Sequence, residues 1–87
     1  MQFQGTIGIY YKTWCSYSQA ALALLEDLGI AYTAIDVTSD TVREAEMVRR
    51  SGRTSVPEIF IDDELIGGYD DLRALLDLGA FEVLKAA

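Results

Sequence analysis

Hydrophobic residues first alternate along the chain and then take up a helical period. Ile7, Ile9 and Tyr11 occupy every second position of residues 6–11, which predicts a β-strand. From Ser16 onward, apolar residues recur three or four positions apart, which predicts a helix. They are Tyr17, Ala20, Ala21, Leu24, Leu25 and Leu28, followed by Gly29 at the place of a helix-ending glycine.

A second strand and a second helix follow. Residues 32–37 are rich in β-forming residues and predict a strand. Thr41 and Glu44 then have the spacing of a capping box, in which each side chain binds a backbone N–H at a helix start. Gly52 marks the expected end of this helix.

The last third of the chain predicts a hairpin and a helical region. Residues 58–62 and 64–66 are short β-type runs joined by an acidic turn at Asp62 and Asp63, and two glycines end the second run. The helical region is expected to hold a helix capped by Asp70, with Leu72, Leu75 and Leu76 on its apolar face and Gly79 as its stop, and a short last helix over residues 80–86.

The element order β-α-β-α-β-β-α-α predicts an α/β fold. A helical crossover makes the first two strands parallel, and the hairpin adds an antiparallel pair. The sheet is therefore expected to be mixed, with helices on both faces. With 87 residues, the chain has room for one domain, which we expect to span residues 1–87.

Composition excludes several chemistries. The chain has no histidine, which excludes Ser/His/Asp and Cys/His catalysis and zinc sites that need an imidazole. Cys15 is the single cysteine, so it cannot form a disulfide within the chain or a cysteine cluster for a metal. We therefore expect no metal site made by this chain alone.

The net charge and the hydropathy of the chain restrict the kinds of partner that it can bind. The net charge of −7 disfavours nucleic acid, because the protein repels phosphates. The longest apolar run, residues 20–25, is far shorter than a membrane span, and residues 1–5 lack the features of a secretory signal. We expect a cytoplasmic protein that does not insert into membranes.

The sharpest chemical feature is the segment K-T-W-C-S-Y-S, residues 12–18, at the junction of the first strand and helix. Cys15 lies at the expected helix N-terminus, where free N–H groups favour an anion, and Lys12 adds a positive charge. Thiolates in such places have pKa values of about 3.5–7.5, against about 8.5 for free cysteine. The alternative is a buried, unreactive cysteine, which is common in proteins.

Three separated motifs together resemble glutaredoxins, the thioredoxin-fold proteins that use glutathione. They are K-T-W-C-S-Y-S, T-S-V-P-E-I-F-I and G-G-Y-D-D-L, in the order and at the separations of that family, and the match covers residues 6–84. The resemblance implies a thioredoxin-like (glutaredoxin) α/β fold with a four-stranded mixed sheet flanked by helices. It also implies a cis peptide bond before Pro57.

The resemblance assigns the chemistry to one thiol. Cys15 matches the catalytic cysteine, and Ser18 occupies the position of the second, resolving cysteine of dithiol relatives. The serine is either natural or an engineered replacement of cysteine. In both cases the resemblance implies a monothiol mechanism.

The resemblance also implies contacts with glutathione. Val56 would pair its backbone with the glutathione cysteine, next to Ser55 and Pro57, although Val-Pro is also an ordinary strand entry. Backbone and side-chain groups of Asp70 and Asp71 would hold the γ-glutamyl end. The proposed glutathione-binding set is Lys12, Tyr17, Arg43, Ser55, Val56, Pro57, Asp70 and Asp71.

Lys12 and Arg43 are assigned to the glycine carboxylate of glutathione. Relatives carry Gln or Arg on the second helix for this contact, but the matching position here is Glu44, which has the wrong charge. Arg43 is the substitute that we predict. For Lys12 the alternative is a solvated surface lysine, and for Tyr17 it is packing within the helix.

The expected function is glutathione-dependent thiol-disulfide oxidoreduction of protein or small-molecule mixed disulfides. Glutathione is the expected co-substrate, and glutathionylated proteins are the expected partners. We expect the protein to be a monomer. An alternative is a [2Fe-2S] carrier, in which two copies each contribute Cys15 and two glutathiones supply the other thiolates. A brown, visibly absorbing protein after anaerobic purification would indicate the carrier. A third reading, a non-catalytic glutathione-binding module, predicts binding without turnover.

Overall fold

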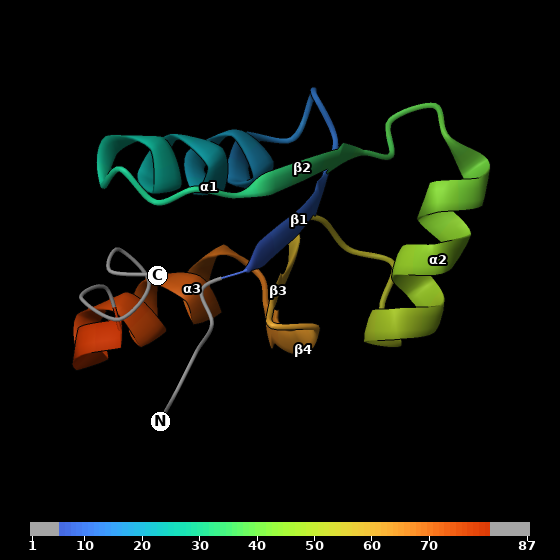
Figure 1. The fold of residues 1–87 in the computed structure, drawn as a ribbon. Helices are drawn as coiled ribbons and strands as arrows, with labels where there is room; N and C mark the ends of the chain where they lie inside the picture. Colours follow the sequence, from blue (N-terminus) through green and yellow to red (C-terminus); the bar gives the residue numbers. More distant parts are fainter. Residues whose placement is uncertain (1–5, 81–87) are drawn as a thin grey trace.

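A computed structural model describes residues 6–80, which build a four-stranded sheet flanked by helices (Figure 1). The strand order is β2-β1-β3-β4, with β1 parallel to β2, and with β1 and β3, and β3 and β4, antiparallel. The mixed α/β sheet predicted from the sequence is thus confirmed. Its elements are β1 (Ile7–Tyr11), α1 (Ser16–Asp27), β2 (Thr33–Asp36), α2 (Thr41–Ser51), β3 (Glu58–Ile61), β4 (Glu64–Gly67), α3 (Tyr69–Leu75) and the π-type segment Leu76–Ala80.

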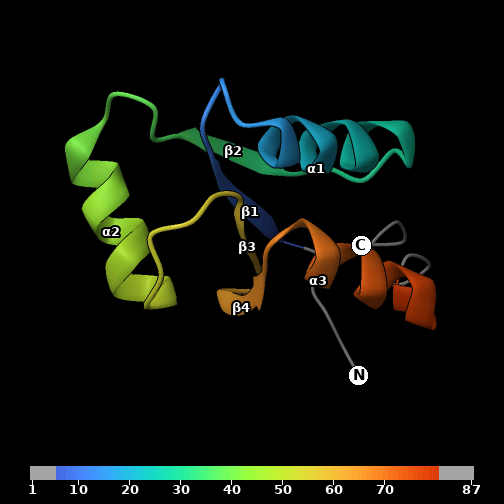
Figure 2. The ribbon, with the colours of Figure 1, turned by 180° about the vertical axis from the view of Figure 1, so that it is seen from behind.

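The sheet separates two hydrophobic clusters. On one face, Ile9 of β1 packs in a cluster with Leu25 of α1 and Leu72 of α3. On the other face, Tyr10 of β1 packs in a cluster with Met47 of α2. The two views show α1 and α3 on one side of the sheet and α2 on the other (Figures 1 and 2).

The alternation expected in the first strand holds only in part. Ile7 and Ile9 are buried as expected, but Tyr10 is also buried and Tyr11 is only half-buried. Successive residues of a strand point to opposite faces of the sheet. Because helices cover both faces of the central strand β1, residues of both sets are buried.

The capping box predicted from Thr41 and Glu44 is wrong in both residues, because the N-cap lies one position earlier and the Glu44 carboxylate pairs with Lys12. The N-cap of α2 is Asp40, whose carboxylate accepts a hydrogen bond of 3.0 Å from the backbone N–H of Arg43. Thr41 is the first helical residue instead. Asp and Thr are both good N-cap residues, so sequence alone did not separate two neighbours.

The third helix begins earlier than predicted, at Tyr69, with Gly68 as its N-cap. Asp70, the expected cap, lies in the first turn, and Asp71 accepts a 3.0 Å hydrogen bond from the Gly68 N–H. Gly67 has a φ of +125°, and a Cβ there would overlap the Asp71 carboxylate. Glycine therefore allows the chain to turn from β4 into α3.

The helical region at the end of the described chain is irregular. Helix α3 ends at Leu75, and Gly79 interrupts the following π-type segment with a φ of +96°. The predicted last helix over residues 80–86 lies outside the described residues, apart from Ala80. Between residues 6 and 80, no helix has both the length and the apolar character needed to cross a membrane.

Candidate active site

Cys15 is the N-cap residue of α1, as the sequence predicts. Its backbone is extended, with φ of −88° and ψ of 120°, and its carbonyl accepts a hydrogen bond of 3.1 Å from the N–H of Gln19. Among the contacts that hold the preceding loop, the Cys15 N–H donates to the Lys12 carbonyl at 3.2 Å, and the Thr13 N–H donates to the Thr38 hydroxyl at 2.9 Å. The sulfur is therefore presented from a loop that is tied to the rest of the protein.

The surroundings lower the pKa of the Cys15 thiol below its ordinary value. Burial alone raises this pKa, but hydrogen bonds from the backbone N–H and hydroxyl of Ser18, and from the N–H of Tyr17, outweigh it. The charge of Lys12 also lowers the pKa and is the smallest of these contributions. The sequence thus predicted the direction of the shift but missed the hydroxyl of Ser18.

Ser18 lies one helical turn after Cys15 and is fully buried. Its hydroxyl accepts a hydrogen bond of 3.3 Å from the backbone N–H of Lys12. The side chain at the resolving position therefore joins the first turn of α1 to the loop that carries the cysteine.

Val56 is the residue that the fold brings to the thiol from far along the chain. The Cys15 sulfur lies 3.7 Å from the Val56 carbonyl oxygen, across 41 positions of sequence. The peptide bond between Val56 and Pro57 is cis, as the resemblance implies. This places the reactive sulfur next to a backbone acceptor two residues before β3 begins at Glu58.

A groove of about 190 Å³ lies beside this pair. Tyr17 of α1, 62% exposed, stands at the groove with Tyr69 of α3, and their ring centroids are 6.4 Å apart. The full lining is Tyr17, Arg53, Ser55, Val56, Pro57, Gly68, Tyr69, Asp70 and Asp71. Six of the predicted glutathione contacts are therefore together in one place.

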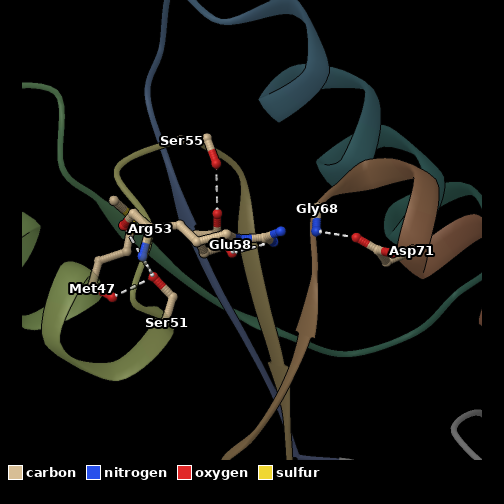
Figure 3. A network of polar contacts seen from close by, with 7 residues as sticks. All are labelled: Met47, Ser51, Arg53, Ser55, Glu58, Gly68 and Asp71. Carbon is tan, nitrogen blue, oxygen red and sulfur yellow. Dashed lines mark hydrogen bonds and ion pairs between the residues drawn. The ribbon is translucent and has the colours of Figure 1, made fainter.

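A buried carboxylate organises the wall of the groove next to Val56. Glu58 of β3 is fully buried, and its oxygens accept hydrogen bonds of 2.8 Å from Arg53 Nη2 and 2.9 Å from the Ser55 hydroxyl (Figure 3). The backbone N–H of Arg53 donates to the hydroxyl of Ser51 at 3.1 Å. Because a buried carboxylate needs charged and polar partners, this network fixes the side chains of Arg53 and Ser55.

The opposite wall carries two aspartates with different surroundings. Asp71 is engaged in the start of α3 through its contact with the Gly68 N–H (Figure 3). Asp70 is exposed, and no hydrogen bond or ion pair of its side chain occurs among residues 6–80. The groove thus presents an unengaged carboxylate facing a region that also contains the guanidinium of Arg53.

Two of the predicted basic contacts do not line this groove. The Lys12 ammonium lies beside the loop of Cys15, where its Nζ is 2.8 Å from Oε2 of Glu44 in α2. Arg43 is directed elsewhere, because its Nη1 is paired with Oε2 of Glu46 at 2.9 Å and this contact raises its pKa. The structure therefore does not bring Arg43 to the groove.

Sequence reasoning missed Arg53, the basic residue that does line the groove. The basic contact was predicted on the second helix, whereas Arg53 follows the Gly52 that ends this helix. The sequence feature that indicates this residue is its position three residues before Val56, as the one charged residue of segment 51–57. Its partner Glu58 gave no such signal, because burial of a carboxylate is not visible in sequence.

A family model and two sequence relatives that match this chain carry the name glutaredoxin. The family model described as Glutaredoxin matches residues 7–66. Glutaredoxin 3 of Escherichia coli strain K12 is 42% identical over 78 residues, which cover 90% of this chain and 94% of that protein. Glutaredoxin of Pseudomonas aeruginosa is 37% identical over 79 residues, covering 91% and 94%.

Solved structures agree on the fold. The solution structure of glutaredoxin from Brucella melitensis has a TM-score of 0.76 and 37% identity, covering 94% of this chain and 91% of that one. A buckwheat glutaredoxin-glutathione complex has a TM-score of 0.80 at 24% identity, covering 92% and 76%, and supports the thioredoxin-like fold alone. With a family match over most of its length and these relatives, the chain belongs to the glutaredoxin family.

Proposed function

We propose that this protein is a glutathione-dependent oxidoreductase that removes glutathione from mixed disulfides by a monothiol mechanism. Membership of the glutaredoxin family makes it a thiol-disulfide oxidoreductase. The observation that carries the finer proposal is the position of Cys15. The chain's single thiol has a lowered pKa and lies 3.7 Å from a backbone carbonyl beside a groove with charges of both signs.

The proposed binding mode follows from the groups around the sulfur. The cysteine of glutathione pairs its backbone with Val56, as one added rung of antiparallel strand. Its γ-glutamyl end, which carries an ammonium and a carboxylate, enters the groove. There the Asp70 carboxylate suits the ammonium. The backbone N–H groups at the start of α3 suit the carboxylate, as does Arg53, which binds Glu58 through Nε and Nη2 but keeps 46% of its side chain exposed, against 19% for Lys12. Tyr17 and Ser55 complete the walls.

The reaction then needs two thiol-disulfide exchanges. The Cys15 thiolate attacks the glutathione sulfur of the mixed disulfide, a new bond forms between these two sulfurs, and the substrate leaves as its thiolate. A second glutathione thiolate attacks the glutathione sulfur on Cys15, which releases oxidised glutathione and restores the Cys15 thiolate. Over the two exchanges, one glutathione thiol is consumed, the substrate leaves as a thiol, and the two glutathione units leave joined as oxidised glutathione, so no second protein thiol takes part.

Steady-state kinetics test this proposal. A glutathione mixed disulfide of a small thiol is the substrate, and glutathione, glutathione reductase and NADPH report turnover. We expect turnover in the protein as it stands and none in Cys15→Ser, since the chain has no other thiol. Circular dichroism of the variant serves as the folding control. Binding of glutathione without turnover would instead indicate a binding module.

A further inference from the structure

The ammonium of Lys12, near the reactive thiol, is already paired within the protein. Its Nζ lies 2.8 Å from Oε2 of Glu44 and 5.5 Å from the ring centroid of Trp14. The side chain of Lys12 is only 19% exposed, and that of Glu44 is 36% exposed. A ligand carboxylate that approaches Lys12 therefore meets an ion pair without net charge instead of a free cation.

This ion pair is separate from the groove, whose lining includes neither Lys12 nor Glu44. The groove is bounded by the start of α3, whereas Glu44 belongs to α2, and these helices lie on opposite sides of the sheet (Figure 2). Lys12 is linked to Cys15 through the turn in which the Cys15 N–H donates to the Lys12 carbonyl. In the binding mode proposed above the γ-glutamyl end fills the groove, so the glycine end lies outside it, and the Lys12–Glu44 pair beside the loop of Cys15 is the charged surface that we assign to that end.

The two ends of glutathione have different charges. The γ-glutamyl end is a zwitterion, and the groove offers charges of both signs. The glycine end is a carboxylate, and the surface that it faces contains one ammonium and one carboxylate in contact. That surface gives a carboxylate little advantage over an uncharged group, because attraction by Lys12 is offset by repulsion from Glu44.

We propose that Glu44 is a specificity-determining residue that cancels the charge of Lys12. The active site then accepts γ-glutamylcysteinyl disulfides whose far end is uncharged, such as an ester or an amide, as readily as it accepts glutathione disulfides. The inference rests on the proposed function, because it concerns the orientation of the same substrate at Cys15. It adds a substrate class that a site with a free lysine would disfavour.

A competition experiment tests this selectivity in one tube. The reduced protein is mixed with equal amounts of oxidised glutathione and of its ester at both glycine carboxylates. The Cys15 thiolate attacks one sulfur of either disulfide, a protein-glutathione or protein-ester bond forms, and the other half leaves as a thiolate. The two adducts differ by the mass of the ester group, so intact-protein mass spectrometry at early times gives the ratio of the two rates.

The protein as it stands is expected to form the two adducts at rates within about twofold of each other. Freeing Lys12 by Glu44→Gln is expected to favour the free acid about fivefold, and Lys12→Met, which leaves Glu44 alone, to favour the ester about fivefold. Both preferences should fall as salt is added. Glu26→Gln is the matched control: it makes the same change of charge near the end of α1 that is far from Cys15, where this carboxylate accepts a hydrogen bond from the Tyr32 hydroxyl, and it should leave the ratio unchanged.

A preference above about tenfold for the free acid in the unaltered protein would overturn the inference. The same holds for a ratio that neither substitution moves, or that Glu26→Gln moves as much as Glu44→Gln. In those cases adducts still form, so the proposed function survives. If neither disulfide forms an adduct with Cys15, the proposed function fails and the inference fails with it.

Discussion

The sulfur of Cys15 lies 3.7 Å from the carbonyl oxygen of Val56, a residue 41 positions further along the chain. In the thiol form, the S–H donates toward this oxygen. Once the proton has left, the oxygen is available to a backbone N–H of a bound peptide. Loss of the thiol proton therefore frees a backbone acceptor for the substrate at the same place where the reactive sulfur forms.

The acidity of Cys15 should depend more on Ser18 than on Lys12. The hydroxyl of Ser18 and its N–H lower the pKa of the thiol more strongly than the charge of Lys12 does. A lowered pKa means that the thiolate is present at lower pH, so the rate of alkylation by iodoacetamide should rise at a lower pH than for free cysteine. Ser18→Ala should move this midpoint upward by more than Lys12→Ala does. Equal midpoints in Ser18→Ala and the unaltered protein would refute the role of the hydroxyl.

A cysteine introduced at position 18 should form a disulfide with Cys15. Ser18 lies one turn along α1 from Cys15, and residues three positions apart share a helix face. After treatment with oxidised glutathione, Ser18→Cys is expected to lose two protons and to retain no glutathione, because the new thiol expels it. The protein as it stands should keep a single adduct. A stable adduct on the variant would show that position 18 is not the resolving position.

Substitutions at Asp70 and Asp71 should affect different quantities, glutathione affinity at the first and fold stability at the second. Asp70→Asn removes a carboxylate that has no partner among residues 6–80 and should weaken glutathione binding about tenfold with little change in stability. Asp71→Ala removes the group that accepts the Gly68 N–H, so it should lower the free energy of unfolding. Calorimetric titration and urea denaturation measure the two effects. Unchanged affinity in Asp70→Asn would contradict the proposed ammonium contact.

Arg53 should stabilise the fold as well as line the groove. Arg53→Ala leaves the fully buried carboxylate of Glu58 with the Ser55 hydroxyl as its one partner among residues 6–80, and should lower the free energy of unfolding by about 3 kcal/mol. The matched control is Arg73→Ala, which breaks an exposed pair with Asp77 and should cost less than about 0.5 kcal/mol. Similar losses in the two variants, measured by urea denaturation, would show that the burial of Glu58 adds nothing.

The sequence alone predicted those features that depend on neighbours along the chain. The period of apolar residues predicts the strands and helices, and the strand-helix junction predicts the position of Cys15 and the direction of its pKa shift. The three motifs predict the family, which the comparisons confirm. Local rules were insufficient where two neighbours compete, as with Asp40 and Thr41 at the start of α2.

Only the tertiary structure decided which charged groups meet. Lys12 was expected to be free for a ligand, but folding places Glu44 of α2 against it. Arg43 was expected at the site, but Glu46 holds it, while Arg53 lines the groove because the buried Glu58 binds it there. The physical reason is that an ion pair depends on the separation of two side chains in space and on their access to water, and neither quantity is encoded in the local period of the sequence.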